Sequence, residues 1–111
     1  MSNIGRQIKN EEKGLIIFLL NLADRCDLVS LIPGLIYDMD DGEMGGIMFT
    51  NDIDRVYEKD LIQVNYIDSD KTLVIITLTL DNSEELFELD FWKVNFDKLI
   101  KYPLPNEIKM A

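Results

Sequence analysis

The stretch "ELFELDFWKVNF", residues 85–96, contains the clearest alternation of apolar and polar side chains in this sequence. Successive side chains of a β-strand point to opposite faces, so the alternation predicts a strand with one apolar and one polar face. The apolar face consists of Phe87, Leu89 and Phe91. The opposite face carries Glu88, Asp90 and Trp92.

The preceding segment, residues 72–80, has a matching alternation and is separated from this strand by the turn-forming sequence "DNSE". Antiparallel pairing across that turn predicts three apolar pairs on one face: Leu78 with Phe87, Ile76 with Leu89, and Val74 with Phe91. On the other face, Thr77 is expected opposite Glu88, and Leu73 opposite Trp92. Residues 61–67 extend this sheet, because Ile62, Val64 and Tyr66 continue its apolar face.

Two further strands, residues 35–39 and 46–50, are predicted on either side of a turn-rich loop. A helix is expected from Asn10, its N-cap, to about Leu28, because apolar residues recur there at helical spacing. The predicted fold is α+β, with the N-terminal helix packed on one face of a mostly antiparallel sheet of about five strands. We expect a single domain, residues 1–111, with an ordered core at about 10–102 and an irregular C-terminal tail.

The charge of the chain is strongly acidic and unevenly distributed. The net charge is −10, and residues 38–90 contain 15 acidic against 3 basic residues. Such a surface repels phosphate backbones, so nucleic-acid binding is not expected. An acidic surface suits solubility alone or binding to a basic protein partner, and both interpretations stay open.

The sequence lacks residues that several kinds of catalytic and metal sites commonly use. The chain has no His, which removes the commonest general base, and its lone Cys26 is expected to be a small buried hydrophobe within the helix. The apolar run at residues 15–23 is too short to cross a membrane and is followed by charged residues, so a cytoplasmic protein is expected. We expect no cofactor, no metal and no enzymatic activity.

Two acidic motifs carry alternative hypotheses. The loop sequence "DMDDGE", residues 38–43, resembles the start of a calcium loop, but Gly42 and Phe49 occupy positions where that loop needs ligands. Glu88 and Asp90 leave the same face of a strand roughly 7 Å apart, a separation compatible with acid–base chemistry in a cleft. A small carboxylate-based ligand- or metal-binding domain, or a hydrolase, is therefore the alternative function.

Trp92 admits two interpretations. It is either an exposed anchor for a partner or an aromatic that the tail buries through Leu99, Ile100 or Tyr102. The preferred function is a non-enzymatic interaction module with an acidic binding face. The candidate surface consists of Thr77, Glu88, Asp90 and Trp92, together with Asp38, Asp40, Asp41 and Glu43.

The motif "ELFELDFWKVNF", with the upstream "DMDDGEMGGIMF", resembles a family of small bacterial proteins known only as a domain of unknown function. The family is characterised by an N-terminal helix, a D-D-G-x-M-G-like turn and a strand of the form F-E-L-D-x-W-K-V-x-F. The resemblance spans about residues 11–101 and implies a shared fold, but it implies no activity, cofactor or catalytic residue. In size and charge alone, the chain is also similar to immunity proteins that neutralise bacterial toxins.

Overall fold

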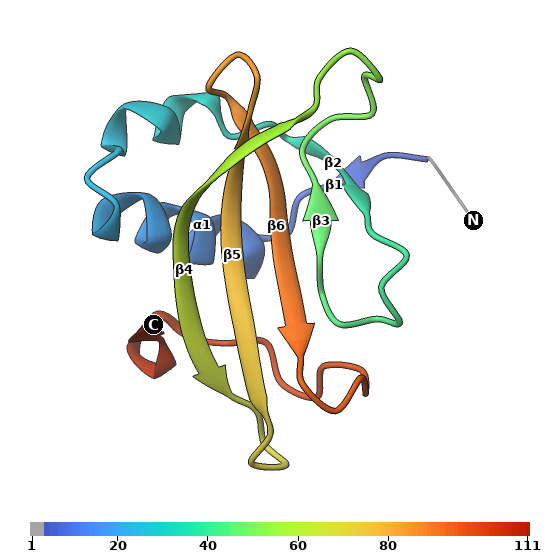
Figure 1. Ribbon diagram of the computed structural model, residues 1–111, viewed down its shortest axis with the longest axis vertical. Helices are drawn as coiled ribbons and strands as arrows, with labels where there is room; N and C mark the ends of the chain where they lie inside the picture. The colour runs from blue at the N-terminus through green and yellow to red at the C-terminus, as the bar shows by residue number, and fades with distance from the viewer. Residues whose placement is uncertain (1–3) are drawn as a thin grey trace.

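A single antiparallel sheet dominates the computed structural model, which describes residues 4–111 (Figure 1). Over these residues the sheet has seven strands in the order β1-β2-β3-β6-β5-β4-β7. The strands are β1 (Arg6–Gln7), β2 (Leu35–Asp38), β3 (Ile47–Met48), β4 (Tyr57–Ile67), β5 (Leu73–Asp81), β6 (Leu86–Lys93) and β7 (Lys109–Met110). The helical elements are α1 (Asn10–Leu22) and the 3-10 helices η1 (Cys26–Leu31) and η2 (Pro105–Glu107).

The expected fold class is confirmed as α+β with one main helix, whereas the number of strands was underestimated. The edge strands β1 and β7 have two residues each, so they are too short to show a detectable alternation of apolar and polar residues. Strand β4 begins at Tyr57, before the predicted start at residue 61, so the polar residues just before residue 61 belong to the strand. The tail was predicted to be irregular, but it contains η2 and β7.

Helix α1 begins where expected but ends earlier. Its N-cap is Lys9, one residue before the predicted Asn10, and the Glu12 carboxylate accepts a hydrogen bond from the Lys9 backbone N–H at 2.9 Å. The helix ends at Leu22, because Asp24 adopts a left-handed φ of 57° that a continuing helix does not allow. The segment up to residue 28, which was predicted to be helical, therefore turns into η1.

Cys26 was expected to be buried within the helix, and this is wrong. It is the first residue of η1, its side chain is exposed, and its Sγ donates a hydrogen bond to the Asn21 side-chain oxygen at 2.7 Å. The early end of α1 is the reason, because the apolar stripe that was to include Cys26 stops one turn before it.

The hydrophobic core contains residues of both α1 and the sheet. Leu15, Ile16, Leu19 and Leu20 of the helix belong to the same buried cluster as the inward-facing strand residues. These strand residues include the predicted Ile62, Val64, Tyr66, Val74, Ile76, Leu78, Leu89 and Phe91. Complete burial of one Leu or Ile side chain contributes about 1.5–3 kcal/mol, so this shared cluster is the main source of stability.

The register between β5 and β6 differs from the prediction by two residues over most of its length. Leu78 pairs with Leu89, and Ile76 with Phe91. Because the shift is even, the buried faces stay the same. Nearer the turn, Leu80 pairs with Leu86, so β6 accommodates an extra residue in a bulge. The Thr79 hydroxyl exchanges two hydrogen bonds with the Glu88 backbone at this bulge. Phe87, predicted to be core, is only partly buried there.

A buried ion pair lies at the end of β6. Lys93 is 0% exposed, and its ammonium group contacts the Asp68 carboxylate at 2.8 Å and the Asp70 carboxylate at 3.0 Å. Asp68, in the turn between β4 and β5, also accepts hydrogen bonds from the backbone N–H groups of Ile100 and Lys101. One carboxylate therefore joins this turn, the end of β6 and the C-terminal segment.

Candidate functional site

The face of the sheet opposite the core cluster presents cross-strand rows of side chains from β4, β5 and β6. One row contains Gln63, Thr77 and Asp90, and the next contains Asn65, Ile75 and Trp92. We call this surface the outer face. Of the predicted site residues, Thr77, Asp90 and Trp92 are thus adjacent. Thr77 is almost covered by its neighbours, and its hydroxyl accepts a hydrogen bond from the Gln63 amide at 3.1 Å.

Trp92 is 45% exposed. Its ring contacts Phe96 edge to face at a centroid distance of 4.8 Å, and Phe96 is itself 66% exposed. Tyr102, one of the tail residues expected to cover Trp92, lies instead against Phe91 with ring centroids 5.6 Å apart. Ile100 is exposed, and Leu99 packs against the core cluster. Of the two interpretations of Trp92, the exposed aromatic is the one observed.

The outer face continues from Trp92 as an apolar surface. Leu73 pairs with Ile67, and the Val94 backbone N–H donates to the Leu73 carbonyl oxygen at 3.0 Å. Ile67 and Val94 are 53% and 43% exposed. Together with Ile75, Trp92 and Phe96, these residues form an apolar region beside the carboxylates. We call this combination the apolar half of the outer face.

Glu88 and Asp90 form the acidic half of the outer face. Both are partly buried, and among residues 4–111 neither takes part in a salt bridge. Burial raises the pKa of Glu88, and the nearby Asp90 charge adds to this effect. Burial likewise raises the pKa of Asp90, with further contributions from Asp41 and Asp60. These carboxylates are therefore partly desolvated without a compensating cation.

The predicted acidic loop connects β2 to β3 and has a different internal organisation from a calcium loop. Asp41 accepts hydrogen bonds from the backbone N–H groups of Met44 and Gly46, at 3.1 and 2.9 Å. Gly42 and Gly45 have φ values of 72° and 108°, a backbone conformation that glycine adopts without a steric penalty. Within residues 4–111, no group of three or more Asp, Glu or Cys side chains is placed to hold a metal ion.

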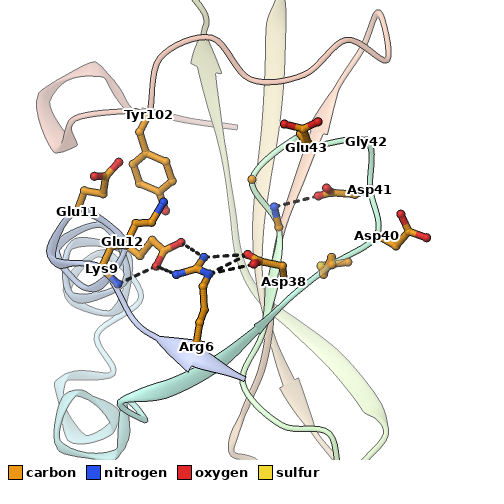
Figure 2. A pocket seen from close by; sticks show the side chains of 13 residues that line it. Arg6, Lys9, Glu11, Glu12, Asp38, Asp40, Asp41, Gly42, Glu43 and Tyr102 are labelled. Atoms are coloured by element: carbon orange, nitrogen blue, oxygen red, sulfur yellow. Dashed lines mark hydrogen bonds and ion pairs between the residues drawn. The ribbon is translucent and has the colours of Figure 1, made fainter. Parts of the chain in front are cut away.

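A cavity of about 530 Å³ lies between this loop and the start of α1. Figure 2 shows Tyr102 and Lys9 on one side of it and Glu43 on the loop at the other. Arg6 lies between them and binds the Glu12 carboxylate at 2.6 Å and the Asp38 carboxylate at 2.8 Å. Asp38, Asp40, Asp41 and Glu43 all line the cavity, so the predicted loop residues gather here and not beside Trp92.

Sequence reasoning missed the other components of this cavity. Arg6 precedes the expected ordered core, and Tyr102 was considered only as a cover for Trp92. The pairing of Arg6 in β1 with Ile36 in β2 places Arg6 close to Asp38. A strand of two residues is too short to be detected from a periodic pattern. An Arg just before a helix that begins with acidic residues was, however, a signal from which an ion pair could have been predicted.

The fold and these two surfaces define the chain as a small α+β protein that presents carboxylate and aromatic side chains on an antiparallel sheet. The chain matches the family described as Domain of unknown function (DUF6984) over residues 5–103, and it belongs to this family. Neither a curated protein nor a solved structure matches the chain significantly. Within residues 4–111, no helix is long and apolar enough to cross a membrane.

Proposed function

We propose that this chain is a non-enzymatic, cytoplasmic protein-interaction module that binds a basic protein through its outer face. The observation that carries the proposal is the position of Trp92, exposed beside Glu88 and Asp90. Aromatic anchors with a polar rim are typical of protein interfaces. A Lys or Arg side chain of a partner would give the two carboxylates the cation that they lack within the chain.

The two halves of the outer face support a partner that combines basic and apolar side chains. The apolar half offers contact area around Trp92 and Ile75, and the acidic half offers charge complementarity. Charge complementarity mainly increases the association rate, whereas a buried aromatic anchor mainly slows dissociation. Neutralisation of a basic toxin, as by an immunity protein, is one form of this proposal. A gene for a basic toxin next to the gene for this chain would favour that form.

A pull-down from the native host tests the proposal. The wild type is compared with Trp92→Ala and Glu88→Lys, and Glu58→Lys serves as the matched control. Glu58 lies on β4, is exposed, and has no salt bridge within residues 4–111, so its substitution changes the charge equally at a distance from Trp92. Circular dichroism checks that all variants are folded.

Partners captured by the wild type and by Glu58→Lys should be lost with the other two variants. For a purified partner, loss of an aromatic anchor should weaken binding by about thirtyfold, which corresponds to about 2 kcal/mol. Glu88→Lys should slow association most strongly at low salt. Capture of the same partners by all four proteins would show that the outer face is not the interface.

A further inference from the structure

We propose that the cavity between α1 and the β2–β3 loop binds a small organic cation, a ligand that carries an ammonium or guanidinium group. The residues that line the cavity do not include Glu88, Asp90 or Trp92, so this site is additional to the proposed protein interface. Its volume of about 530 Å³ is within the range of roughly 300–1,000 Å³ that is usual for small-molecule sites.

The charge of the cavity selects a cation. Arg6 and Lys9 line it together with six acidic residues, which gives its lining a net charge of −4. The acidic residues are Glu11, Glu12, Asp38, Asp40, Asp41 and Glu43. Such a concave surface concentrates positively charged ligands.

Arg6 does not provide an anion site, because its donors are already used. Its Nε–H donates to Asp38, and its two terminal nitrogens donate to the Gln7 carbonyl oxygen, to Glu12 and to Asp38. A guanidinium group has five N–H donors, so this network leaves none for a phosphate or carboxylate ligand. The pKa of Arg6 is raised by its hydrogen bonds to Glu12 and Asp38, so it keeps its charge.

Tyr102 supplies an independent indication of a ligand. Its hydroxyl group is buried and has no hydrogen-bond partner within residues 4–111. Native proteins rarely leave a buried polar group unsatisfied. Burial raises the pKa of Tyr102 strongly, so the hydroxyl group stays neutral. Its oxygen has almost no accessible surface, so it accepts a hydrogen bond from an ammonium or guanidinium N–H only when the groups that cover it move aside. In Figure 2 this side chain extends from the tail toward the cavity, on the side opposite Glu43.

A bare metal ion fits the cavity less well than an organic cation. Arg6 binds Glu12 and Asp38, and Asp41 accepts two backbone hydrogen bonds, so three of the six carboxylates are already engaged. Across residues 4–111, no cluster of three acidic or Cys side chains has a geometry for metal binding. Glu43, Asp40 and Glu11 line the cavity and have no salt bridge among the described residues, so they remain for a larger ligand.

Lys9 sets the expected limit on affinity. Among the described residues it is the cation of the cavity that has no salt bridge, and it lines the cavity together with Tyr102. Its charge repels an incoming cation, so Lys9→Met should strengthen binding by roughly twofold to fivefold.

Isothermal titration calorimetry with spermidine and agmatine tests the site, with MgCl₂ at matched ionic strength as a control for charge alone. Tyr102→Phe, which keeps the ring, should weaken binding of both amines about tenfold. Glu43→Gln should weaken it roughly twofold to fivefold. Glu58→Gln, a neutralised carboxylate away from the cavity, should bind as the wild type does.

The shared chemistry also occurs in Lys and Arg side chains of proteins, so acetylated and amidated Gly-Lys-Gly and Gly-Arg-Gly peptides form a second arm. Binding of free amines but not of the peptides assigns the site to a free metabolite, and binding of both assigns it to an exposed side chain as well. Trp92→Ala should leave amine binding unchanged, which separates this site from the proposed interface. No heat with any probe, equal heat with MgCl₂, or unchanged binding by Tyr102→Phe would overturn the proposal.

Discussion

Trp92 and Lys93 are neighbours on β6, and their burial is the reverse of what their polarity would lead one to expect. The aromatic residue is 45% exposed on the outer face, whereas the charged residue is 0% exposed within the fold. The difference is in the partners. Lys93 has Asp68, Asp70 and the Lys98 carbonyl oxygen around its ammonium group, while Trp92 has Phe96 beside its ring. Burial of a charge is tolerated only with such partners.

The same contrast applies to the carboxylates on the two sides of the sheet. Burial alone would raise the pKa of Asp68, but hydrogen bonds from Lys93 and from backbone N–H groups outweigh it and lower the pKa. Asp90 has no such cation, so its pKa is raised by burial and by neighbouring carboxylates. A satisfied carboxylate stabilises the fold, and an unsatisfied one is available for a partner.

The largest expected effect comes from breaking the inner pair. Asp68→Asn removes the buried counterion of Lys93 and should lower the free energy of unfolding by about 3–5 kcal/mol in urea denaturation. Asp70→Asn is the matched control, because Asp70 also contacts Lys93 but is itself exposed, and it should cost less than about 1 kcal/mol. Equal losses for both variants would contradict the dominant role that we assign to Asp68.

The pH dependence of stability follows from the same group. The folded-state pKa of Asp68 lies below its ordinary value of 3.8, so its stabilisation is fully present above that value and is lost as the pH falls through the folded pKa. Denaturation at pH 7 and at successively lower pH values below 4 should therefore show the wild type losing more stability than Asp68→Asn. Parallel curves for the two proteins would contradict this assignment.

Trp92→Ala should have a smaller effect on folding than on binding. Loss of its edge-to-face contact with Phe96 and of part of its buried area should cost about 1 kcal/mol in the free energy of unfolding. Phe96→Ala removes the same ring contact from the other side and should cost a similar amount. A loss above about 3 kcal/mol, typical of a buried aromatic residue, would place Trp92 in the core.

Asp90→Asn should change stability in the direction opposite to Asp68→Asn. The raised pKa of Asp90 means that its charged form is disfavoured in the folded state, so neutralisation at pH 7 should stabilise the protein by about 0.5 kcal/mol. The gain should disappear at acidic pH, where the wild-type carboxyl group is protonated as well. A destabilised Asp90→Asn would indicate that the carboxylate has a partner within the fold.

Tyr102→Phe should change stability least. Its hydroxyl group is buried without a partner, so its removal leaves no other group unsatisfied, and the ring contact with Phe91 is kept. The thermal unfolding midpoint in the absence of added amines should be unchanged or slightly higher. A clear decrease would show that the hydroxyl group is bonded within the protein.

The sequence predicted the strands and their faces well, because alternation reports directly which residues share a face. The apolar faces of β4 and β5, together with Leu89 and Phe91 of β6, are buried as predicted. The β5–β6 register could not be predicted, because Asp81 belongs to β5 and the bulge beside Thr79 adds a residue to β6. Neither feature can be predicted from the number of residues in the turn.

The candidate site was predicted only in part. Alternation placed Asp90 and Trp92 together on the outer face, and the structure has them there. The acidic loop lines a cavity with Arg6 and Tyr102, which are far from it in the sequence, and this meeting depends on the pairing of β1 with β2 and on the path of the tail. Long-range pairings of this kind leave no periodic signal.

The Asp68 carboxylate also has a consequence for cooperativity. It receives Lys93 from β6 and the backbone N–H groups of Ile100 and Lys101 from the tail, so its bonds span 25 to 33 residues of sequence. Release of the tail would leave a buried charge without part of its hydrogen bonding. Detachment of the tail and opening of the sheet are therefore coupled into one event, and the Ile100 and Lys101 amide protons should exchange with solvent as slowly as those of the central strands.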